Sequence, residues 1–284
     1  MRSLLFVPGD SMRKFEKARA GSADALILDL EDSVAPDGKE RARGIIGEML
    51  RAPRKGQKLF VRINAMDTGH SLDDLVAALP CRPDGIVLAK SAHGDDIRLL
   101  SAWLDALETA YGIERGRTQI IAIVTETAEA LFNLGSYKGA SSRLWGLMWG
   151  AEDLAASFGA TTNRVDGAYA APFVMARNLC LAGAAAATVV AIDAVCTDIT
   201  NIDLVRTEAM DARRDGFGAK AIIHPAHIEP VNLAFSPSDE QIAWARQVVE
   251  ALDHGGAIGV ARLNGMMIDK PHLLQARRLL DSIR

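Results

Sequence analysis

Eight short apolar runs, each followed by a longer segment with helical periodicity, constrain the fold of this chain more than any other feature of its sequence. The runs are nearly continuous in apolar residues, which is typical of parallel strands covered on both faces. Strands that alternate with helices indicate a parallel sheet, and eight such units predict a closed (β/α)8 TIM barrel of the α/β class. The expected strands span residues 3–8, 25–30, 58–63, 85–90, 119–124, 144–149, 188–193 and 220–225.

An open doubly wound sheet is the alternative fold. Such a sheet usually has fewer strands and a glycine-rich phosphate turn after the first one, and the chain has neither a GxGxxG nor a GxxxxGKS motif. Segments 71–79 and 94–112 combine acidic starts with helical apolar spacing, as the crossovers of a barrel require. We therefore prefer the barrel.

The pattern changes after residue 235. Residues 236–252 predict a serine-capped amphipathic helix, residues 253–265 a glycine-punctuated connector, and residues 266–284 a separate helix. We expect a catalytic barrel at 1–235 and a C-terminal helical extension at 236–284 that acts as a lid or an oligomer arm.

The composition of the chain argues against two classes of function, nucleic-acid binding and thiolate metal binding. The net charge is -4, and no segment accumulates lysine or arginine, so we expect no binding to nucleic acid. The three cysteines, Cys81, Cys180 and Cys196, are widely spaced and form no CxxC pair, which disfavours disulfides and thiolate metal sites and fits a reducing cytoplasm.

Neither of the two most apolar stretches reads as a targeting or membrane segment. The N-terminal run is broken by Pro8 and Gly9 and lacks a cleavage site. Residues 179–195 are mostly alanine and glycine and are interrupted by Asp193, so we expect the end of a buried helix followed by a strand. The sequence thus predicts a cytoplasmic protein without a membrane partner.

Polar side chains follow nearly every expected strand, and barrel enzymes assemble their active sites at those strand ends. Acids after strands also cap helices or begin turns, so Asp29 and Asp32 taken singly fit a structural role as well. The candidates for the active site are Glu31, Asp32, Arg62, Lys90, Glu126, Glu152, Asp153 and His224.

Carboxylates that converge on one mouth repel each other, and a divalent cation or a cationic side chain usually compensates. Glu126 and Asp153, after adjacent strands, are the best pair of metal ligands. Two carboxylates favour magnesium over zinc, which prefers histidine or cysteine. His224 and His227 offer at most an i, i+3 pair, and we expect His227 to be structural.

Arg62 is the candidate cation at the mouth. Its planar guanidinium suits a substrate carboxylate or an enolate oxygen. The alternative role is an internal ion pair with Glu31 or Asp32, and both roles are compatible if these acids orient the arginine.

With these residues in view, the sequence closely resembles the citrate lyase beta-subunit-like family of the HpcH/HpaI aldolase/citrate lyase superfamily, which includes malyl-CoA, citramalyl-CoA and citryl-CoA lyases. Several motifs in order and spacing carry the resemblance. They are RSLLFVPGDSMRKFEKA (2–18), LDLEDSVAPDGKERAR (28–43), VRIN (61–64), TETAEAL (125–131), WGAEDLAASFGA (149–160), IHPAHIEPVNLAFSPS (223–238) and MIDKP (267–271).

The resemblance implies a magnesium-dependent barrel enzyme that cleaves a 3-hydroxyacyl-CoA thioester to acetyl-CoA and a 2-oxo acid through a thioester enolate. By matching positions, it implies Glu126 and Asp153 as metal ligands and Arg62 as the residue that binds a substrate oxygen. It implies Asp269 as an acid supplied from the lid of a neighbouring subunit in a homotrimer or hexamer.

The remaining candidates fall into two groups. Glu31 and Asp32 are expected in the catalytic set beside Arg62. For contacts with substrate or CoA we expect the first-motif residues, which match CoA-binding positions of the relatives, and two strand-end residues; together these are Phe6, Arg13, Lys17, Glu152 and His224.

The chain departs from the family at one place, since relatives commonly have DGK where this chain has Asn264, Gly265 and Met266. This departure puts the lid contacts in question. Three other functions stay open: a citrate lyase beta subunit that acts on citryl-acyl carrier protein, a class II 2-oxo acid aldolase without CoA, and a silent binding protein. The residues do not choose the acyl group or assign the acceptor of the hydroxyl proton.

Overall fold

The computed structural model describes residues 1–253, 259–281 and 283, which form two compact units, Met1–Asn232 and Leu233–Arg284. None of the helices in these residues is long and apolar enough to cross a membrane.

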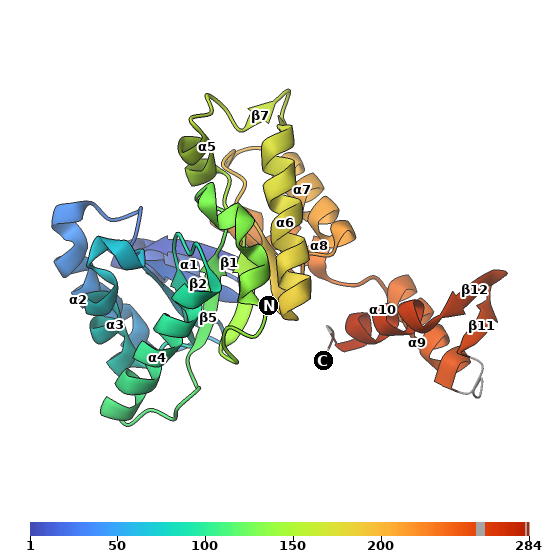
Figure 1. Cartoon of the computed structure of the whole chain (residues 1–284), viewed down its shortest axis with the longest axis horizontal. Helices are drawn as coiled ribbons and strands as arrows, with labels where there is room; N and C mark the ends of the chain where they lie inside the picture. Colours follow the sequence, from blue (N-terminus) through green and yellow to red (C-terminus); the bar gives the residue numbers. More distant parts are fainter. Residues whose placement is uncertain (254–258, 282, 284) are drawn as a thin grey trace. The chain divides into compact units, whose positions relative to one another are not determined.

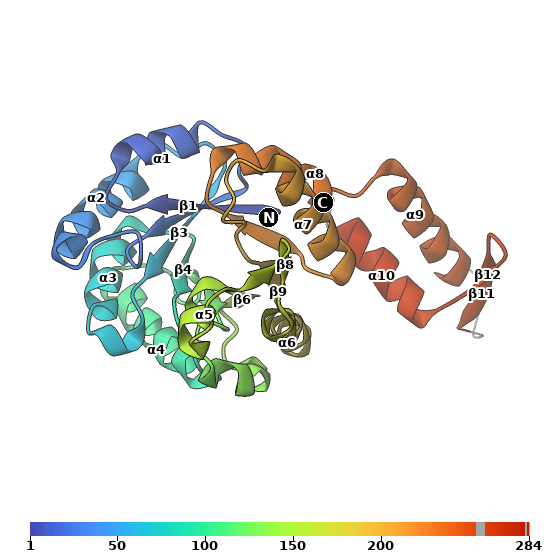
Figure 2. The ribbon, with the colours of Figure 1, turned by 90° about the horizontal axis from the view of Figure 1, so that it is seen from above.

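The first unit contains a closed barrel of eight parallel strands, ordered β1-β10-β9-β6-β5-β4-β3-β2, with helices outside the strands (Figures 1 and 2). The eight predicted strands and the (β/α)8 fold are confirmed, although several strands begin or end one to three residues away from their predicted bounds. The barrel strands are β1 Ser3–Pro8, β2 Ala25–Asp29, β3 Lys58–Ile63, β4 Gly85–Leu88, β5 Gln119–Ile123, β6 Leu144–Met148, β9 Val190–Asp193 and β10 Ala219–Ile222.

Helices connect most of these strands. Between β5 and β6 the chain instead forms two short 3-10 turns, Glu129–Phe132 and Leu134–Tyr137. A small hairpin that the sequence did not predict, β7 Arg164–Val165 and β8 Ala168–Tyr169, precedes α6. The helices of this unit are α1 Met12–Arg19, α2 Lys39–Arg51, α3 Ser71–Ala78, α4 Gly94–Ala110, α5 Glu152–Phe158, α6 Ala171–Ala187, α7 Ile202–Asp215 and α8 Ile228–Phe235, the last of which continues into the second unit.

An apolar core fills the inside of the barrel. The alternation of side chains along its strands places the first charged residues of the site directly after this core. Along β2, Ala25 and Ile27 belong to this core, and along β3 Phe60 does. Because side chains alternate across a strand, the next inward positions are Asp29 and Arg62. The first charged layer therefore lies directly above the apolar one.

The second unit differs from the prediction in one element. Helix α9, Asp239–Asp253, follows Ser238, which exchanges hydrogen bonds with Gln241 as a capping box, so the predicted serine cap is confirmed. The predicted connector and the start of the predicted last helix are partly wrong, because β11 Val260–Leu263 and β12 Met266–Asp269 form a hairpin. Residues 254–258 of that connector lie outside the described residues.

The turn of this hairpin shows why residues 260–269 form strands and not the predicted connector and helix start. Asn264 and Gly265 both have positive φ, 49° and 83°, as a two-residue hairpin loop of the mirror-image type requires. Helix α10 begins only at Lys270 and runs to Asp281. Asn-Gly between apolar runs is a hairpin signal, so the departure from DGK keeps a residue that tolerates the left-handed conformation.

Candidate active site

The floor of the site is a buried ion pair between the ends of β2 and β3. Asp29 and Arg62 are partners in the strand register, and Nε and Nη2 of Arg62 donate to the two carboxylate oxygens of Asp29 over 2.6 and 2.7 Å. Burial alone would raise the pKa of Asp29, but Arg62 holds it below its ordinary value. This two-point contact fixes the plane of the guanidinium.

The backbone around this pair is tight. The Gly9 N–H donates to the carbonyl oxygen of Asp29 over 2.9 Å, and a Cβ on Gly9 would lie 2.5 Å from that oxygen. Only glycine permits this approach, so the Pro8-Gly9 sequence after β1 locks the end of β2 in place.

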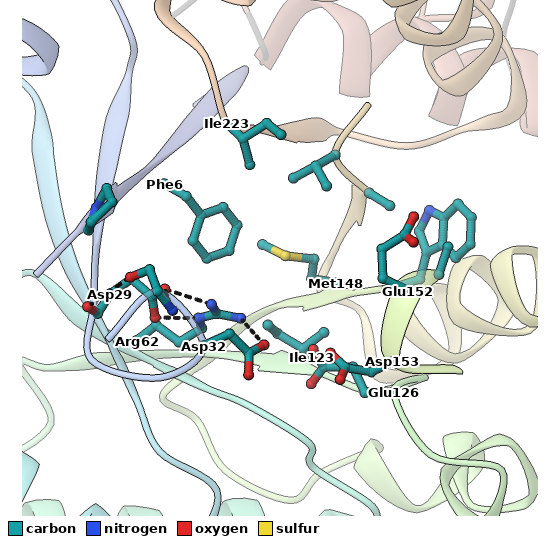
Figure 3. Close-up of a pocket in the computed structure, with 17 residues that line it drawn as sticks. Phe6, Asp29, Asp32, Arg62, Ile123, Glu126, Met148, Glu152, Asp153 and Ile223 are labelled. Atoms are coloured by element: carbon teal, nitrogen blue, oxygen red, sulfur yellow. Dashed lines mark hydrogen bonds and ion pairs between the residues drawn. The ribbon is translucent and has the colours of Figure 1, made fainter. Parts of the chain in front are cut away.

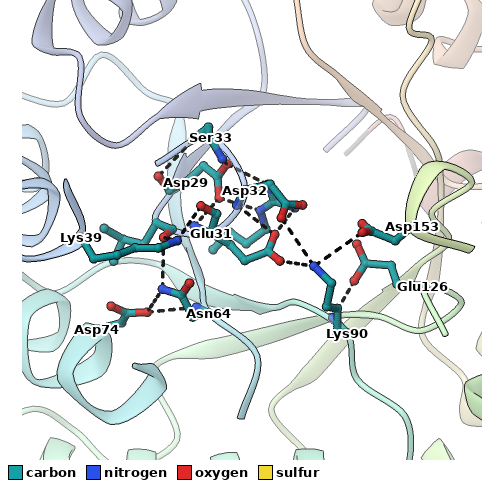
Figure 4. A network of polar contacts seen from close by, with 12 residues as sticks. Asp29, Glu31, Asp32, Ser33, Lys39, Asn64, Asp74, Lys90, Glu126 and Asp153 are labelled. Atoms are coloured by element: carbon teal, nitrogen blue, oxygen red, sulfur yellow. Dashed lines mark hydrogen bonds and ion pairs between the residues drawn. The ribbon is translucent and has the colours of Figure 1, made fainter. Parts of the chain in front are cut away.

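Two more acids, Glu31 and Asp32, lie next to Arg62, and a second cation, Lys90, lies beside them; Figure 4 shows Lys90 with both acids. Nη1 of Arg62 lies 2.9 Å from Glu31 Oε2 and 3.7 Å from Asp32 Oδ2. The Lys90 ammonium contacts Glu31 and lies 3.5 Å from Asp32 Oδ1. The expected ion pair of Arg62 with Glu31 or Asp32 is thus present.

Glu126 is the least satisfied acid of the site. It follows β5, and its side chain is almost fully buried, with 5% exposed. Among the described residues, one hydrogen-bond donor reaches its carboxylate, the Lys90 N–H at 2.5 Å from Oε2. Burial raises the pKa of Glu126 to about 8, although Arg62 and the Lys90 N–H act in the opposite direction.

Asp153 brings a second carboxylate to Glu126. It lies in the first turn of α5 and is adjacent to Glu126 in both close-up views (Figures 3 and 4). Its charge contributes to the raised pKa of Glu126. Asp153 Oδ1 lies 3.6 Å from Lys90 Nζ. Two carboxylates that follow neighbouring strands therefore converge, as predicted for Glu126 and Asp153.

These residues line a cavity of about 400 Å³ with two chemically different walls (Figure 3). The acidic wall holds Asp32, Glu126, Glu152 and Asp153, and Arg62 contributes its guanidinium. The apolar wall consists of Phe6, Ile123, Met148, Trp149, Ala194, Val195 and Ile223. The Arg62 guanidinium also stacks on the Phe6 ring, with 4.9 Å from Cζ to the ring centroid. Such a cavity suits a small molecule with both an anionic or chelating end and an apolar part.

A second cavity, of about 440 Å³, shares Phe6, Pro8 and Ile223 with the first. Its other walls combine apolar residues with three cations of α1, Arg13, Lys14 and Lys17, and with His224, which follows β10. The structure thus brings the four predicted CoA contacts in the barrel, Phe6, Arg13, Lys17 and His224, to one place.

Some predicted residues have other partners. Glu152 lines the first cavity and accepts a hydrogen bond from Asn163 Nδ2 over 2.8 Å. His224 Nδ1 accepts from the Ala226 N–H. Buried His227 lies with Nε2 3.3 Å from the Ile199 carbonyl oxygen, and its ring packs edge-on against that of His224, with 5.9 Å between the centroids. Its structural role stays a prediction.

Asp269 lies in the second unit, at the end of β12, and is not part of either cavity. Its Oδ1 is 2.6 Å from His272 Nδ1 on α10. Its predicted role as a proton donor stays a prediction.

Sequence reasoning missed two functions at the mouth. The sequence leaves Asp29 open between an acid of the mouth and a cap or turn residue, whereas the structure makes it the main partner of Arg62. It marks Lys90 as a candidate at a strand end without a partner, whereas the Lys90 ammonium contacts several acids of the site. The strand alternation that places Asp29 two residues after Ile27 could have revealed the first, but no signal in the sequence shows where the flexible side chain of Lys90 points.

The family model of the HpcH/HpaI aldolase/citrate lyase family matches residues 2–225 of this chain. The (3S)-malyl-CoA thioesterase of Cereibacter sphaeroides is 32% identical over 284 residues, which cover 98% of this chain and 93% of the relative. The citrate lyase subunit beta-like protein of Mycobacterium tuberculosis is 35% identical over 277 residues, which cover 97% and 93%.

A solved structure shows the same likeness in three dimensions. The CitE protein of Mycobacterium tuberculosis, in complex with magnesium, acetoacetate and coenzyme A, matches with a TM-score of 0.80 at 34% identity. The match covers 99% of this chain and 97% of the CitE chain.

Proposed function

The chain belongs to the HpcH/HpaI aldolase/citrate lyase family and is a lyase, and we propose that it cleaves a 3-hydroxyacyl-CoA thioester to acetyl-CoA and a 2-oxo acid with the help of magnesium. The observation that carries the proposal is the pair of adjoining cavities, one acidic with Arg62 at its floor and one basic. A thioester with a polar acyl end and a phosphorylated carrier needs both environments.

The residues present fit magnesium. Glu126 is a buried carboxylate with a single described donor, and Asp153 lies next to it, so the pair lacks a full counter-charge. Two carboxylates that leave positions to water and substrate oxygens are a typical magnesium site. When bound, magnesium would polarise the substrate oxygens as a Lewis acid. The magnesium in the CitE complex supports this assignment.

Arg62 would stabilise charge on the oxygen that becomes the ketone. Two of its five N–H groups donate to Asp29 and Nη1 forms an ion pair with Glu31, so N–H groups of the guanidinium remain for a ligand in the cavity it lines. Because the Asp29 contact fixes the guanidinium, little reorganisation accompanies the reaction. Glu31 and Asp32 would act by orienting and balancing this cation.

The basic cavity would hold the CoA portion. Arg13 and Lys17 present cations that suit phosphate groups, and the Phe6 ring borders both cavities. His224 would contribute a polar wall, and Glu152 would contact the acyl end from the other side.

Cleavage leaves a thioester enolate whose carbon needs a proton, and we assign this step to Asp269, supplied from the lid of a neighbouring copy in a homotrimer or hexamer. The assignment depends on the family motif, and we expect Asp269→Asn to lower kcat at least a hundredfold while CoA affinity changes less than threefold. Equal losses in both would make Asp269 a binding residue.

The test of the function is acetyl-CoA release by the purified chain from citramalyl-, malyl- and citryl-CoA in parallel, with magnesium and then with EDTA. We expect magnesium-dependent release from one of them. Free CoA, followed with a thiol reagent, separates cleavage from thioester hydrolysis, the second candidate that the malyl-CoA thioesterase relative favours. No acetyl-CoA and no free CoA from any of the three would contradict the proposal and favour citryl-acyl carrier protein or a free 2-oxo acid as substrate.

A further inference from the structure

The described residues at the mouth of the barrel carry more negative than positive charge. The two cations there do not contact all the acids equally. Besides Glu152, which accepts a hydrogen bond from Asn163, five described carboxylates contact one of two cations there, Arg62 and Lys90. Figure 4 shows the five together with Lys90. Arg62 donates two hydrogen bonds to Asp29 and forms an ion pair with Glu31. The five acids are Asp29, Glu31, Asp32, Glu126 and Asp153.

Lys90 contacts four of the five acids through two different groups, its ammonium and its main-chain N–H. Its ammonium contacts Glu31 and lies 3.5 Å from Asp32 and 3.6 Å from Asp153. Its main-chain N–H donates to Glu126 over 2.5 Å. A single residue thus contacts both carboxylates of the proposed metal site and two acids beside it.

The backbone of Lys90 is strained in a way that makes this double contact possible. Lys90 has φ of 52°, in the left-handed region that residues with a Cβ rarely adopt. The turn comes directly after Ala89 at the end of β4, and the next N–H, of Ser91, bonds to the carbonyl oxygen of Ile123 in β5. The chain therefore stays attached to β5 while the Lys90 N–H faces Glu126 and its side chain runs to the β2 acids.

We propose that Lys90 is a positioning residue that sorts the five carboxylates, neutralising Glu31 and Asp32 beside Arg62 so that only Glu126 and Asp153 face magnesium. The inference rests on the proposed magnesium site. Without the Lys90 ammonium, Glu31 and Asp32 would be free to enter the coordination shell and occupy positions that substrate oxygens need. The Lys90 N–H would still hold Glu126, because every residue except proline supplies it.

This arrangement predicts a specific change in metal selectivity. Removing one positive charge beside the site tightens binding of any divalent cation. Extra carboxylate ligands favour calcium over magnesium, because calcium accepts six to eight oxygens in flexible geometry. The Lys90→Met protein should therefore bind magnesium about tenfold more tightly, bind calcium with a larger gain still, and turn over at least tenfold more slowly.

The experiment is calorimetric titration of the metal-free full chain with magnesium and with calcium, as wild type, Lys90→Met, Lys90→Arg and Lys90→Gly. Lys90→Arg keeps the charge and should keep the wild-type selectivity. Lys90→Gly removes the ammonium and the backbone strain but keeps the N–H, so it should share the selectivity of Lys90→Met even if the methionine variant folds poorly. Lys58→Met is the matched control, because Lys58 pairs with Asp84 at the opposite end of β3.

The outcomes separate the two proposals. Wild-type protein that binds no magnesium would contradict the proposed metal site itself. Wild-type binding together with unchanged or weaker binding in both Lys90→Met and Lys90→Gly would overturn the sorting role of Lys90 and leave the metal site standing. The same gain in Lys58→Met would show a general charge effect and would also overturn it.

Discussion

Two buried glutamates at opposite ends of β5 have the same side chain but very different surroundings, and we propose a chemical role for only one of them. Glu108 has no exposed surface and lies next to Thr118, which precedes β5. Glu126, which is 5% exposed, follows β5 at the mouth.

The two carboxylates differ in their partners. Glu108 accepts hydrogen bonds from the N–H groups of Gly116 and Thr118 and from both terminal nitrogens of Arg143. Burial alone would raise the pKa of Glu108, but Arg143 and Thr118 hold it below its ordinary value. Glu126 accepts one hydrogen bond among the described residues, and its pKa is raised to about 8.

The number of hydrogen-bond donors, rather than burial, therefore distinguishes Glu108 from Glu126, for which we propose a function. A buried carboxylate with four donors needs nothing further, whereas one with a single donor and a neighbouring acid leaves a charge that a ligand must balance. Perturbed carboxyl groups in clefts are candidates for function on this ground.

The largest expected effect is on turnover. Glu126→Gln should lower magnesium-dependent acetyl-CoA release at least a thousandfold, because the amide is a poor magnesium ligand, while Glu108→Gln should keep it within a few-fold of wild type. Steady-state assays at saturating magnesium measure both. Full activity of Glu126→Gln would remove the metal assignment, and Asp153→Asn repeats the test from the second ligand.

The free energy of unfolding should rank the two substitutions in the opposite order, with the larger loss in Glu108→Gln. Glu108→Gln leaves Arg143 buried with a weaker partner and should lower the free energy of unfolding by about 3 kcal/mol. Glu126→Gln replaces a buried carboxyl that is largely protonated below its pKa of about 8 and unbalanced above it, so it should change the free energy of unfolding by less than about 1 kcal/mol or raise it. Urea unfolding in EDTA measures the difference, and a larger loss in Glu126→Gln than in Glu108→Gln would break the comparison.

The dependence of stability on pH should also have opposite sign for the two residues. The raised pKa means that folded Glu126 binds protons more tightly than the unfolded chain, so in EDTA its contribution to stability falls as pH rises from about 4.5 to about 8. The lowered pKa of Glu108 means that its contribution is present above pH 4.5 and is lost as pH falls. The difference in unfolding free energy between wild type and Glu126→Gln should fall as pH rises from about 4.5 to about 8, whereas that between wild type and Glu108→Gln should rise with pH below about 4.5 and stay flat above it. A flat Glu126 difference between pH 4.5 and 8 would contradict the assignment.

The smallest effect concerns the backbone that supports Glu126. A Cβ on Gly150 would lie 3.1 Å from Glu126 Cγ, so Gly150→Ala should displace this side chain slightly and weaken magnesium binding about threefold. Gly44→Ala on α2 is the control, because a Cβ there meets nothing within 4 Å. Calorimetry that finds the same magnesium affinity in both variants would show that Glu126 has room to move.

The barrel could be predicted from the sequence because continuous apolar runs, such as residues 25–28, fit few folds other than one with strands covered on both faces. The polar residues at the ends of these runs located most of the candidate site. The sequence could not show which charged side chains of the site contact one another. The role of Asp29 depends on its register opposite Arg62, and that of Lys90 on a left-handed turn that no residue type announces. The hairpin at Asn264-Gly265 was missed although its signal was present, because the glycines before it favoured a connector.

The most direct test of the central claim is magnesium titration of the metal-free wild type, Glu126→Gln and Glu108→Gln by calorimetry. The wild type and Glu108→Gln should each bind one magnesium ion per chain with similar affinity, and Glu126→Gln should show no saturable binding. Unchanged magnesium binding in Glu126→Gln would contradict the claim that the unsatisfied acid at the mouth is the functional one.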